Sequence, residues 1–174
     1  MKAVFKKDLT RWGGVSLSLW IREPGVRFMW VMRNCQESCN PIWKFILWRM
    51  REKYGLGISP RVQIGPGFYL GHPYGIDINP AVSIGANCNV HKGVTIGQEN
   101  RGRRKGAPCI GDGVWMGVNS TIVGGITIGD DVLIAPNSFV NFDVPSHSIV
   151  IGNPAKIIHR DNATENYIEN KCIA

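Results

Sequence analysis

The sequence predicts a mainly β fold in which the chain winds into a stack of coils, preceded by a short helical module and followed by a short tail. The main observation is an aliphatic residue at six-residue steps from position 58 to position 140, with two breaks in the count. This period fits neither a helix of about 3.6 residues per turn nor an isolated strand, and it is typical of coils that turn a corner every sixth residue. The column consists of Ile58, Ile64, Leu70, Ile78, Ile84, Val90, Ile96, Ile110, Met116, Ile122, Ile128, Ile134 and Val140.

Two further columns share this period. The fourth residue after each aliphatic position is mostly small or β-branched, which suits a second inward position in a narrow core. This second column consists of Val62, Phe68, Tyr74, Val82, Cys88, Val94, Val114, Ser120, Ile126, Val132, Ser138 and Val144. The third residue after each aliphatic position is often Gly, Asn or Asp, which adopt positive φ at low cost. These corner residues are Gly67, Asn87, Gly93, Gly113, Asn119, Gly125, Asp131, Asn137 and Asp143.

The residues before the repeat form a basic and aromatic module. Residues 1–55 hold eleven Lys and Arg against four Asp and Glu, so 11 − 4 = +7, whereas residues 56–174 hold nine of each. A helical pattern runs from Pro24 to Tyr54 and is expected to break near Asn40 and Pro41, because proline disrupts a helix interior. Five of the six tryptophans lie in this module: Trp12, Trp20, Trp30, Trp43 and Trp48.

Two interpretations of this module stay open. Its helices can pack on the coils and on neighbouring subunits. Alternatively, basic residues combined with Trp and Leu are typical of a helix that docks on an anionic membrane. Nucleic-acid binding is not expected, because the basic residues form no recognised motif and the remaining chain is neutral.

Three short motifs resemble the hexapeptide-repeat acyltransferases, most closely the serine acetyltransferases and the small O-acetyltransferases of surface-polysaccharide pathways. Residues 70–76, LGHPYGI, are similar to the catalytic L-D-H-x-x-G-I; residues 93–97, GVTIG, to S-V-T-L-G; and residues 152–156, GNPAK, to the closing G-x-P-A-K/R. The resemblance covers about residues 56–160. It implies a left-handed parallel β-helix with three hexads per coil, a homotrimer and acetyl-CoA as acetyl donor. The predicted division is a helical module at 1–55, the β-helix at 56–160 and a tail at 161–174.

The repeat first breaks around His72. Phe68 and Tyr74 are large for the inward column, Pro73 occupies a corner, and two extra residues near positions 76 and 77 shift the register. Local rules tend to fail at functional sites. The motif resemblance implies that His72 is the general base that takes the proton of an acceptor hydroxyl, and imidazole suits this role because it titrates near neutral pH. Direct transfer of the acetyl group needs no enzyme nucleophile.

Other polar residues are expected near His72. His91 follows one coil later, so the two histidines are expected to stack on one face, about 4.8 Å apart along the axis. His91 either lines the same groove or points outward without a role. Asp77 is a candidate to orient His72. The candidate substrate-binding residues are Tyr69, Tyr74 and Asn79.

The second break is a loop of eight extra residues between Ile96 and Ile110, which contains Arg101 among several basic residues. Such a run is either simply solvated or placed to bind the phosphates of coenzyme A, and cationic side chains suit phosphate. In the family that the motifs resemble, this loop walls the active site between subunits. The candidate cofactor-binding residues are Arg103, Arg104, Lys105, Gly117, Ala135 and Lys156.

The motifs depart from serine acetyltransferase at three places. Gly71 replaces the Asp before the catalytic His, Gly57 aligns with the Asp that partners that His, and residues 106–108, GAP, align with R-H-P. Losing charge-assisted contacts to an amino acid costs affinity, so the predicted acceptor is a hydroxyl of a sugar in surface-polysaccharide synthesis. The alternatives are serine O-acetylation in cysteine biosynthesis and a non-catalytic trimeric scaffold. No metal site is expected, because the coils offer only His72 and His91 and zinc needs at least three protein ligands.

The cysteines and hydropathy predict a cytoplasmic protein, with the basic module allowing contact with the inner face of the membrane. An odd number of irregularly spaced cysteines argues against a disulfide framework. No apolar run reaches the roughly 18 residues needed to span a bilayer, and no signal-peptide pattern is present. The five cysteines are Cys35, Cys39, Cys88, Cys109 and Cys172.

Overall fold

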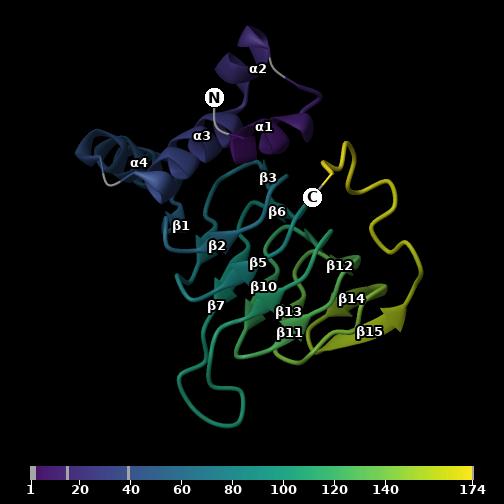
Figure 1. The fold of residues 1–174 in the computed structure, drawn as a ribbon. Helices are drawn as coiled ribbons and strands as arrows, with labels where there is room; N and C mark the ends of the chain where they lie inside the picture. Colours follow the sequence, from purple (N-terminus) through teal and green to yellow (C-terminus); the bar gives the residue numbers. More distant parts are fainter. Residues whose placement is uncertain (1–2, 15, 39, 174) are drawn as a thin grey trace.

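The computed structural model describes residues 3–14, 16–38 and 40–173, and it shows a helical module above a stack of coils (Figure 1). The predicted helical stretch with a break near Asn40 and Pro41 is confirmed. Pro24 and Pro41 stand at the first turns of their helices, where the missing N–H costs nothing, and the Asn40 side chain caps the last helix. Gly55, at φ 63°, ends it. The helices are α1 (Ala3–Thr10), α2 (Leu17–Arg22), α3 (Pro24–Glu37) and α4 (Pro41–Tyr54).

Short strands follow the helices. Most are two or three residues long, as expected for a chain that turns a corner every sixth residue. In the described residues they are β1 (Gly57–Ile58), β2 (Gln63–Ile64), β3 (Tyr69–Gly71), β4 (Asp77–Ile78), β5 (Ser83–Ile84), β6 (Asn89–His91), β7 (Thr95–Gly97), β8 (Cys109–Ile110), β9 (Trp115–Met116), β10 (Thr121–Val123), β11 (Thr127–Ile128), β12 (Val132–Ile134), β13 (Phe139–Val140), β14 (Ser148–Gly152) and β15 (Ala155–His159).

The strands form three sheets, one on each side of the coil stack. The β1 sheet has the order β1-β4-β7-β10-β13, the β2 sheet β2-β5-β8-β11, and the β3 sheet β3-β6-β9-β12-β14-β15. Neighbours in the first two sheets come from successive coils and run parallel, and the same holds for the β3 sheet up to β14. The exception is the antiparallel pair β14 and β15. The predicted β-solenoid with its helical N-terminal part is therefore confirmed.

The aliphatic column forms the core of the solenoid. Twelve of its thirteen members are buried, and Ile64 is half-buried. In the second column the prediction for Tyr74 is wrong, because its side chain is 51% exposed and Ile76 is buried in its place. The two extra residues therefore lie before Ile76, in the corner that contains His72, and not at positions 76 and 77. At the corners, Gly125 and Asp143 lack the expected positive φ; at the first of these corners Gly124 has it.

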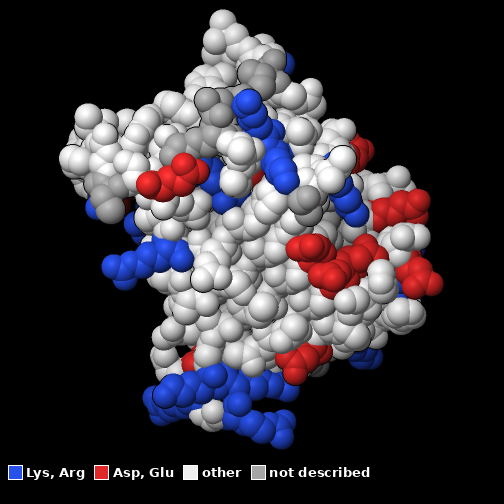
Figure 2. Space-filling model, in the orientation of Figure 1, with Lys and Arg blue, Asp and Glu red and all other residues white. Residues whose placement is uncertain are grey.

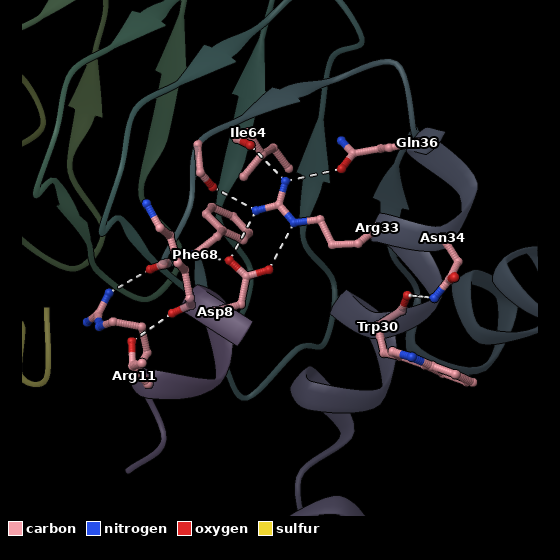
Figure 3. A network of polar contacts seen from close by, with 12 residues as sticks. Asp8, Arg11, Trp30, Arg33, Asn34, Gln36, Ile64 and Phe68 are labelled. Atoms are coloured by element: carbon pink, nitrogen blue, oxygen red, sulfur yellow. Dashed lines mark hydrogen bonds and ion pairs between the residues drawn. The ribbon is translucent and has the colours of Figure 1, made fainter. Parts of the chain in front are cut away.

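A buried ion pair fastens the helical module to the first coil (Figure 3). Arg33 on α3 contacts Asp8 on α1, with Nε 2.9 Å from Oδ2, and both residues are buried. The same guanidinium donates to the carbonyl oxygens of Ile64 and Gly65, while Oδ1 of Asp8 accepts from the backbone N–H of Phe68. Two helices and one coil thus share a single buried network, and a buried pair of this kind is costly to break on one side.

The chain after β15 runs back along the β3 sheet toward the helices (Figure 1). Asp131 accepts hydrogen bonds from the backbone N–H groups of Ala163 and Thr164. Further along, Asn89 donates to the carbonyl oxygen of Tyr167, and Asn87 exchanges two hydrogen bonds with the backbone of Cys172. The tail therefore covers part of the outer face of this sheet.

Candidate active site

His72 lies in the corner between β3 and β4, with its side chain exposed and its backbone at φ 53°. Non-glycine residues rarely adopt this conformation, so the surrounding structure must hold it. Backbone hydrogen bonds do so: the N–H of Gly75 donates to the carbonyl oxygen of Tyr54 at the end of α4, and the N–H of Gly93 on the next coil donates to the carbonyl oxygen of Tyr74. The corner is thus fixed from both sides, and the imidazole stands outside the core.

His91 lies beside this corner, as the stacking of coils predicts. Its register partner on β3 is Gly71, the residue before His72. A Cβ atom at position 71 would lie 2.6 Å from Nδ1 of His91, so the ring occupies the space of any side chain there. Burial lowers the pKa of His91 below its ordinary value, and the charge of neighbouring His72 lowers it further. At a given pH, a smaller fraction of His91 is therefore protonated than of a free imidazole.

Asp77 occupies the space of another missing side chain. It is in register with Gly57 on the neighbouring coil, and its carboxylate fills the position that a side chain at Gly57 would take. A carboxylate from the next coil therefore lies directly beside position 57. Within the residues that the structure describes, no hydrogen bond or ion pair joins Asp77 to His72, so its role as the partner of His72 stays a prediction.

A pocket of about 270 Å³ lies beside His91 on the outer face of the β3 sheet. Aromatic rings line it in sequence: the centroid of Tyr69 is 6.5 Å from that of His91, His91 is 4.8 Å from Trp115, and Trp115 is 5.1 Å from Tyr167 in the tail. Arg11 closes one end and donates to the carbonyl oxygen of Glu169. The pocket is therefore built from both ends of the chain as well as from the coils.

The three candidate substrate-binding residues do not lie together. Tyr69 lines this pocket. Tyr74 follows His72, but its ring packs edge-on against Tyr54 at 5.5 Å. Asn79 accepts from the backbone N–H of Ala81 at 2.9 Å, which makes it a turn residue of the next corner.

The loop between β7 and β8 forms a small hairpin in which Glu99 and Gly106 exchange two backbone hydrogen bonds. The predicted extrusion is confirmed. The Arg104 side chain donates to the carbonyl oxygen of Asn141, whereas Arg103 and Lys105 are exposed. Figure 2 shows a dense group of basic side chains at the end of the molecule where Figure 1 draws this loop. The loop leaves the corner between the β1 and β2 sheets, while His72 lies between the β3 and β1 sheets, so the two occupy different corners of the cross-section.

The remaining cofactor candidates lie on the β3 sheet at increasing distance from His72. Gly117 follows β9, where a Cβ atom would lie 2.8 Å from the ring of Trp115. Ala135 is buried against Ala163 of the tail. Lys156 is exposed on β15, at the opposite edge of the sheet from β3. In the described part of one chain, the basic loop, Ala135 and Lys156 are therefore not assembled around His72.

Sequence reasoning missed Arg11, Trp115 and Tyr167 as residues of the pocket. Trp115 sits one position before the inward Met116 and so faces outward. The repeat could have indicated this outward-facing, half-buried aromatic residue. Arg11 and Tyr167 come from segments outside the repeat, where no period relates them to His91.

Several other chemistries find no support in the described residues. There, no group of three or more His, Cys, Asp or Glu is arranged to hold a metal ion. Over the same residues, no helix has both the length and the apolar character needed to cross a bilayer. The four described cysteines, Cys35, Cys88, Cys109 and Cys172, are free thiols, and Cys39 lies outside the described residues.

Comparisons with known proteins agree with this architecture. The family model described as "Hexapeptide repeat of succinyl-transferase" matches residues 109–141. Serine acetyltransferase 2 of Arabidopsis thaliana is 41% identical over 110 residues, which are 63% of this chain and 34% of that protein. Serine acetyltransferase of Staphylococcus xylosus is 38% identical over 107 residues, 62% of this chain and 50% of that protein.

A solved structure extends the likeness to nearly the whole chain. Serine acetyltransferase of Neisseria gonorrhoeae, determined in complex with serine, superposes with a TM-score of 0.73 at 30% identity, over 89% of this chain and 67% of that one. The chain belongs to the hexapeptide-repeat acyltransferase family. This member spans about a third to a half of the length of the two curated relatives described above.

Proposed function

We propose that this hexapeptide-repeat protein is an acetyl-CoA-dependent O-acetyltransferase of the serine acetyltransferase type, with His72 as general base. The observation that carries this proposal is the exposed imidazole on the irregular corner of the solenoid, held by α4 and the next coil. A general base must reach the proton that it removes, and this corner offers its imidazole to solvent in a fixed place. The likeness to serine acetyltransferases supplies the reaction class.

In this mechanism His72 holds and moves one proton. The imidazole accepts the proton of the acceptor hydroxyl while the oxygen attacks the acetyl carbonyl carbon, and it returns that proton to the sulfur that leaves. Acetyl-CoA supplies the activated acetyl group. Burial and the charge of His72 lower the pKa of His91, which disfavours a second positive charge beside His72 when the latter becomes protonated.

The exposed cations of the basic loop fit the phosphates of the donor. Within the described residues, no acidic side chain forms an ion pair with Arg101, Arg103 or Lys105, so these groups are available to a polyanion. Because the loop and His72 occupy different corners of one chain, we propose a homotrimer in which the loop of one subunit approaches His72 of the next. Lys156, which is likewise exposed and distant from His72 within one chain, stays a candidate for binding the donor's phosphates.

We take serine as the first acceptor to test. The motif departures favoured a sugar hydroxyl, whereas the relatives named above are serine acetyltransferases, one of them solved with serine. The carboxylate of Asp77 also lies beside Gly57, where the side chain of that position would begin. A sugar acceptor is the second candidate, favoured by the aromatic rings of Tyr69, Trp115 and Tyr167 around the pocket.

The test is release of free thiol from acetyl-CoA by the full chain, with serine, sugar nucleotides and oligosaccharides as acceptors. We expect release with serine that depends on both substrates. Release with a sugar and not with serine would keep the reaction and replace the acceptor. If no hydroxyl acceptor releases thiol above the rate of the enzyme alone, the acyl-transfer proposal is wrong and the scaffold alternative gains support.

A further inference from the structure

The helical module carries apolar side chains that no described part of the chain covers. On α4, Ile42, Phe45 and Trp48 are 65%, 60% and 50% exposed, and on α2, Leu17 and Ile21 are exposed even more. The three α4 residues recur every third position and therefore share one face of the helix. Phe45 and Trp48 also contact each other, with ring centroids 5.7 Å apart. An apolar cluster of this kind marks an interaction surface, unlike scattered single residues.

An apolar groove continues this surface between α2, α3 and α4. It has a volume of about 720 Å³ and is lined mainly by apolar atoms, with Phe45 on its wall. Trp20 and Trp30 also line it, with ring centroids 5.2 Å apart in an edge-to-face contact. Its charged lining residues are Arg27, Arg49, Lys53 and the acidic Glu52. The groove thus combines mainly apolar walls with positively charged side chains.

The structure separates the tryptophans of this module into two groups. Trp12, Trp20, Trp30 and Trp43 are half-buried and pack against the core, while Trp48 is exposed. The sequence observation of a basic, Trp-rich segment therefore does not by itself describe a surface. The surface is the α4 face around Phe45 and Trp48, with the neighbouring part of α2.

The charge around this surface has one dominant sign. Residues 1–55 carry the +7 excess of the whole chain, and its buried ion pair, Asp8 with Arg33, removes one charge of each sign. The remaining cations include Arg49, whose guanidinium lies 5.9 Å from the ring centroid of Trp48, and Lys53, whose ammonium lies 5.4 Å from that of Tyr54. Aromatic rings interleaved with cations are typical of a helix at the boundary between anionic headgroups and acyl chains.

We infer that the helical docking face, made of Leu17, Ile21, Ile42, Phe45 and Trp48 with Arg27, Arg49 and Lys53, binds the surface of a membrane rich in anionic lipid. The apolar side chains enter the acyl boundary and the cations contact the phosphates of the headgroups. The helices lie on the membrane and do not cross it. This binding is independent of acetyl transfer, because none of these residues lies in the corner that holds His72.

The test is co-sedimentation of the full chain with vesicles. One set contains phosphatidylglycerol and phosphatidylcholine in equal parts, and the other contains phosphatidylcholine alone. We expect binding to the anionic vesicles that weakens as salt is raised, and little binding to the neutral ones. The double variant Phe45→Ser/Trp48→Ser should reduce the bound fraction by more than about tenfold. Ile157→Ser/Ile158→Ser, on exposed positions of β15, is the matched control and should bind like the unchanged chain.

Three outcomes would overturn the inference. The first is a full chain that does not co-sediment with anionic vesicles. The second is a Phe45→Ser/Trp48→Ser variant that binds them normally. The third is a loss of molecular mass in solution for that variant, measured by light scattering, because the face would then be an interface between copies. Thermal unfolding measured on the same samples shows that the variant is folded, and a chain inactive toward every acceptor can still bind vesicles.

Discussion

The two breaks in the six-residue repeat differ in how they are held. The corner that contains His72 adds two residues and is fixed by backbone hydrogen bonds to α4 and to the next coil. The loop between β7 and β8 adds eight residues and extends as a hairpin, which Arg104 joins to later coils by hydrogen bonds with Gly125 and Asn141, while Arg101, Arg103 and Lys105 are exposed. A group that moves a proton needs a precise position. A group that neutralises phosphates needs a positive charge on a side chain long enough to reach them. The way in which a break is held, and not only the number of inserted residues, therefore indicates which kind of site it builds.

The largest expected effect concerns the fixed corner. His72→Ala should lower kcat by roughly 10²–10⁴ while the fold and the melting temperature are retained, because general-base catalysis contributes about that much. The measurement is steady-state thiol release, with His91→Ala as the matched control at the neighbouring imidazole.

His91→Ala should lower kcat far less than His72→Ala, because His91 acts beside the base and not as the base. If His72→Ala turns over at a near-normal rate, the corner is not the catalytic element. Equal losses in both variants would mean that the two imidazoles work as one unit.

An intermediate effect concerns the loop. Arg101→Gln/Arg103→Gln/Lys105→Gln should raise the KM for acetyl-CoA by about tenfold and leave kcat nearly unchanged. Each exposed ion pair is worth roughly 0.2–1 kcal/mol, and uniform binding affects KM alone. The effect should shrink at high salt. Lys171→Gln, on the tail, is the control for removal of an exposed charge. A large fall in kcat with unchanged KM would make the loop part of the chemistry and remove the contrast with the corner.

The smallest expected effect concerns the tail that walls the pocket beside His91. Burial alone would raise the pKa of Asp131, but hydrogen bonds from Thr164, His147 and Ala163 outweigh it and lower the pKa to about 2. A carboxyl group with a depressed pKa in the folded state stabilises the fold above its unfolded pKa, near 4, and this contribution is lost as the pH falls toward about 2.

Asp131→Asn should therefore lower the melting temperature by about 2–4 °C near neutral pH, for a loss of about 1 kcal/mol, and by much less near pH 2. Thermal unfolding at both pH values is the measurement. Asp161→Asn, whose carboxylate is almost fully exposed, should show no such difference. A pH-independent difference for Asp131→Asn would mean that the tail is held by something other than this carboxylate.

The repeat was predictable from the sequence because every coil offers the same environment to the same position. Ile58, Val90 and Ile134 are equivalent in this sense, and all three are fully buried. Tyr74 broke the pattern because the chain makes room for the two extra residues at the corner, where Tyr74 turns outward and Ile76 moves in. Counting forward along the repeat from Leu70 cannot show on which side of the corner the two extra residues lie. Counting back two residues from Ile78 places Ile76, and not Tyr74, in the inward second column.

The candidate site was only partly predictable for a related reason. Gly71, the residue before His72, pairs with His91 in the β3 sheet, so the adjacency of the two histidines follows from the repeat. Arg11 reaches the same pocket from the turn that follows α1, and its partner Glu169 lies 158 residues further along the chain. Tertiary packing of the two chain ends decides that contact, and no local pattern encodes it. That the Asp77 carboxylate fills the space beside Gly57 likewise becomes visible only when neighbouring coils are placed in register.

The reversed direction of β15 has a consequence for self-association. A stack of parallel coils presents unpaired N–H and C=O groups at its last rung, and such an edge can recruit another chain and grow into a fibre. On the β3 sheet the final strand is antiparallel to β14, and at the other edge α3 packs against β3. At the β3 edge, α3 therefore stands where a further parallel rung would pair, and at the other edge a further rung would meet the reversed strand β15 and not a continuation of the coils.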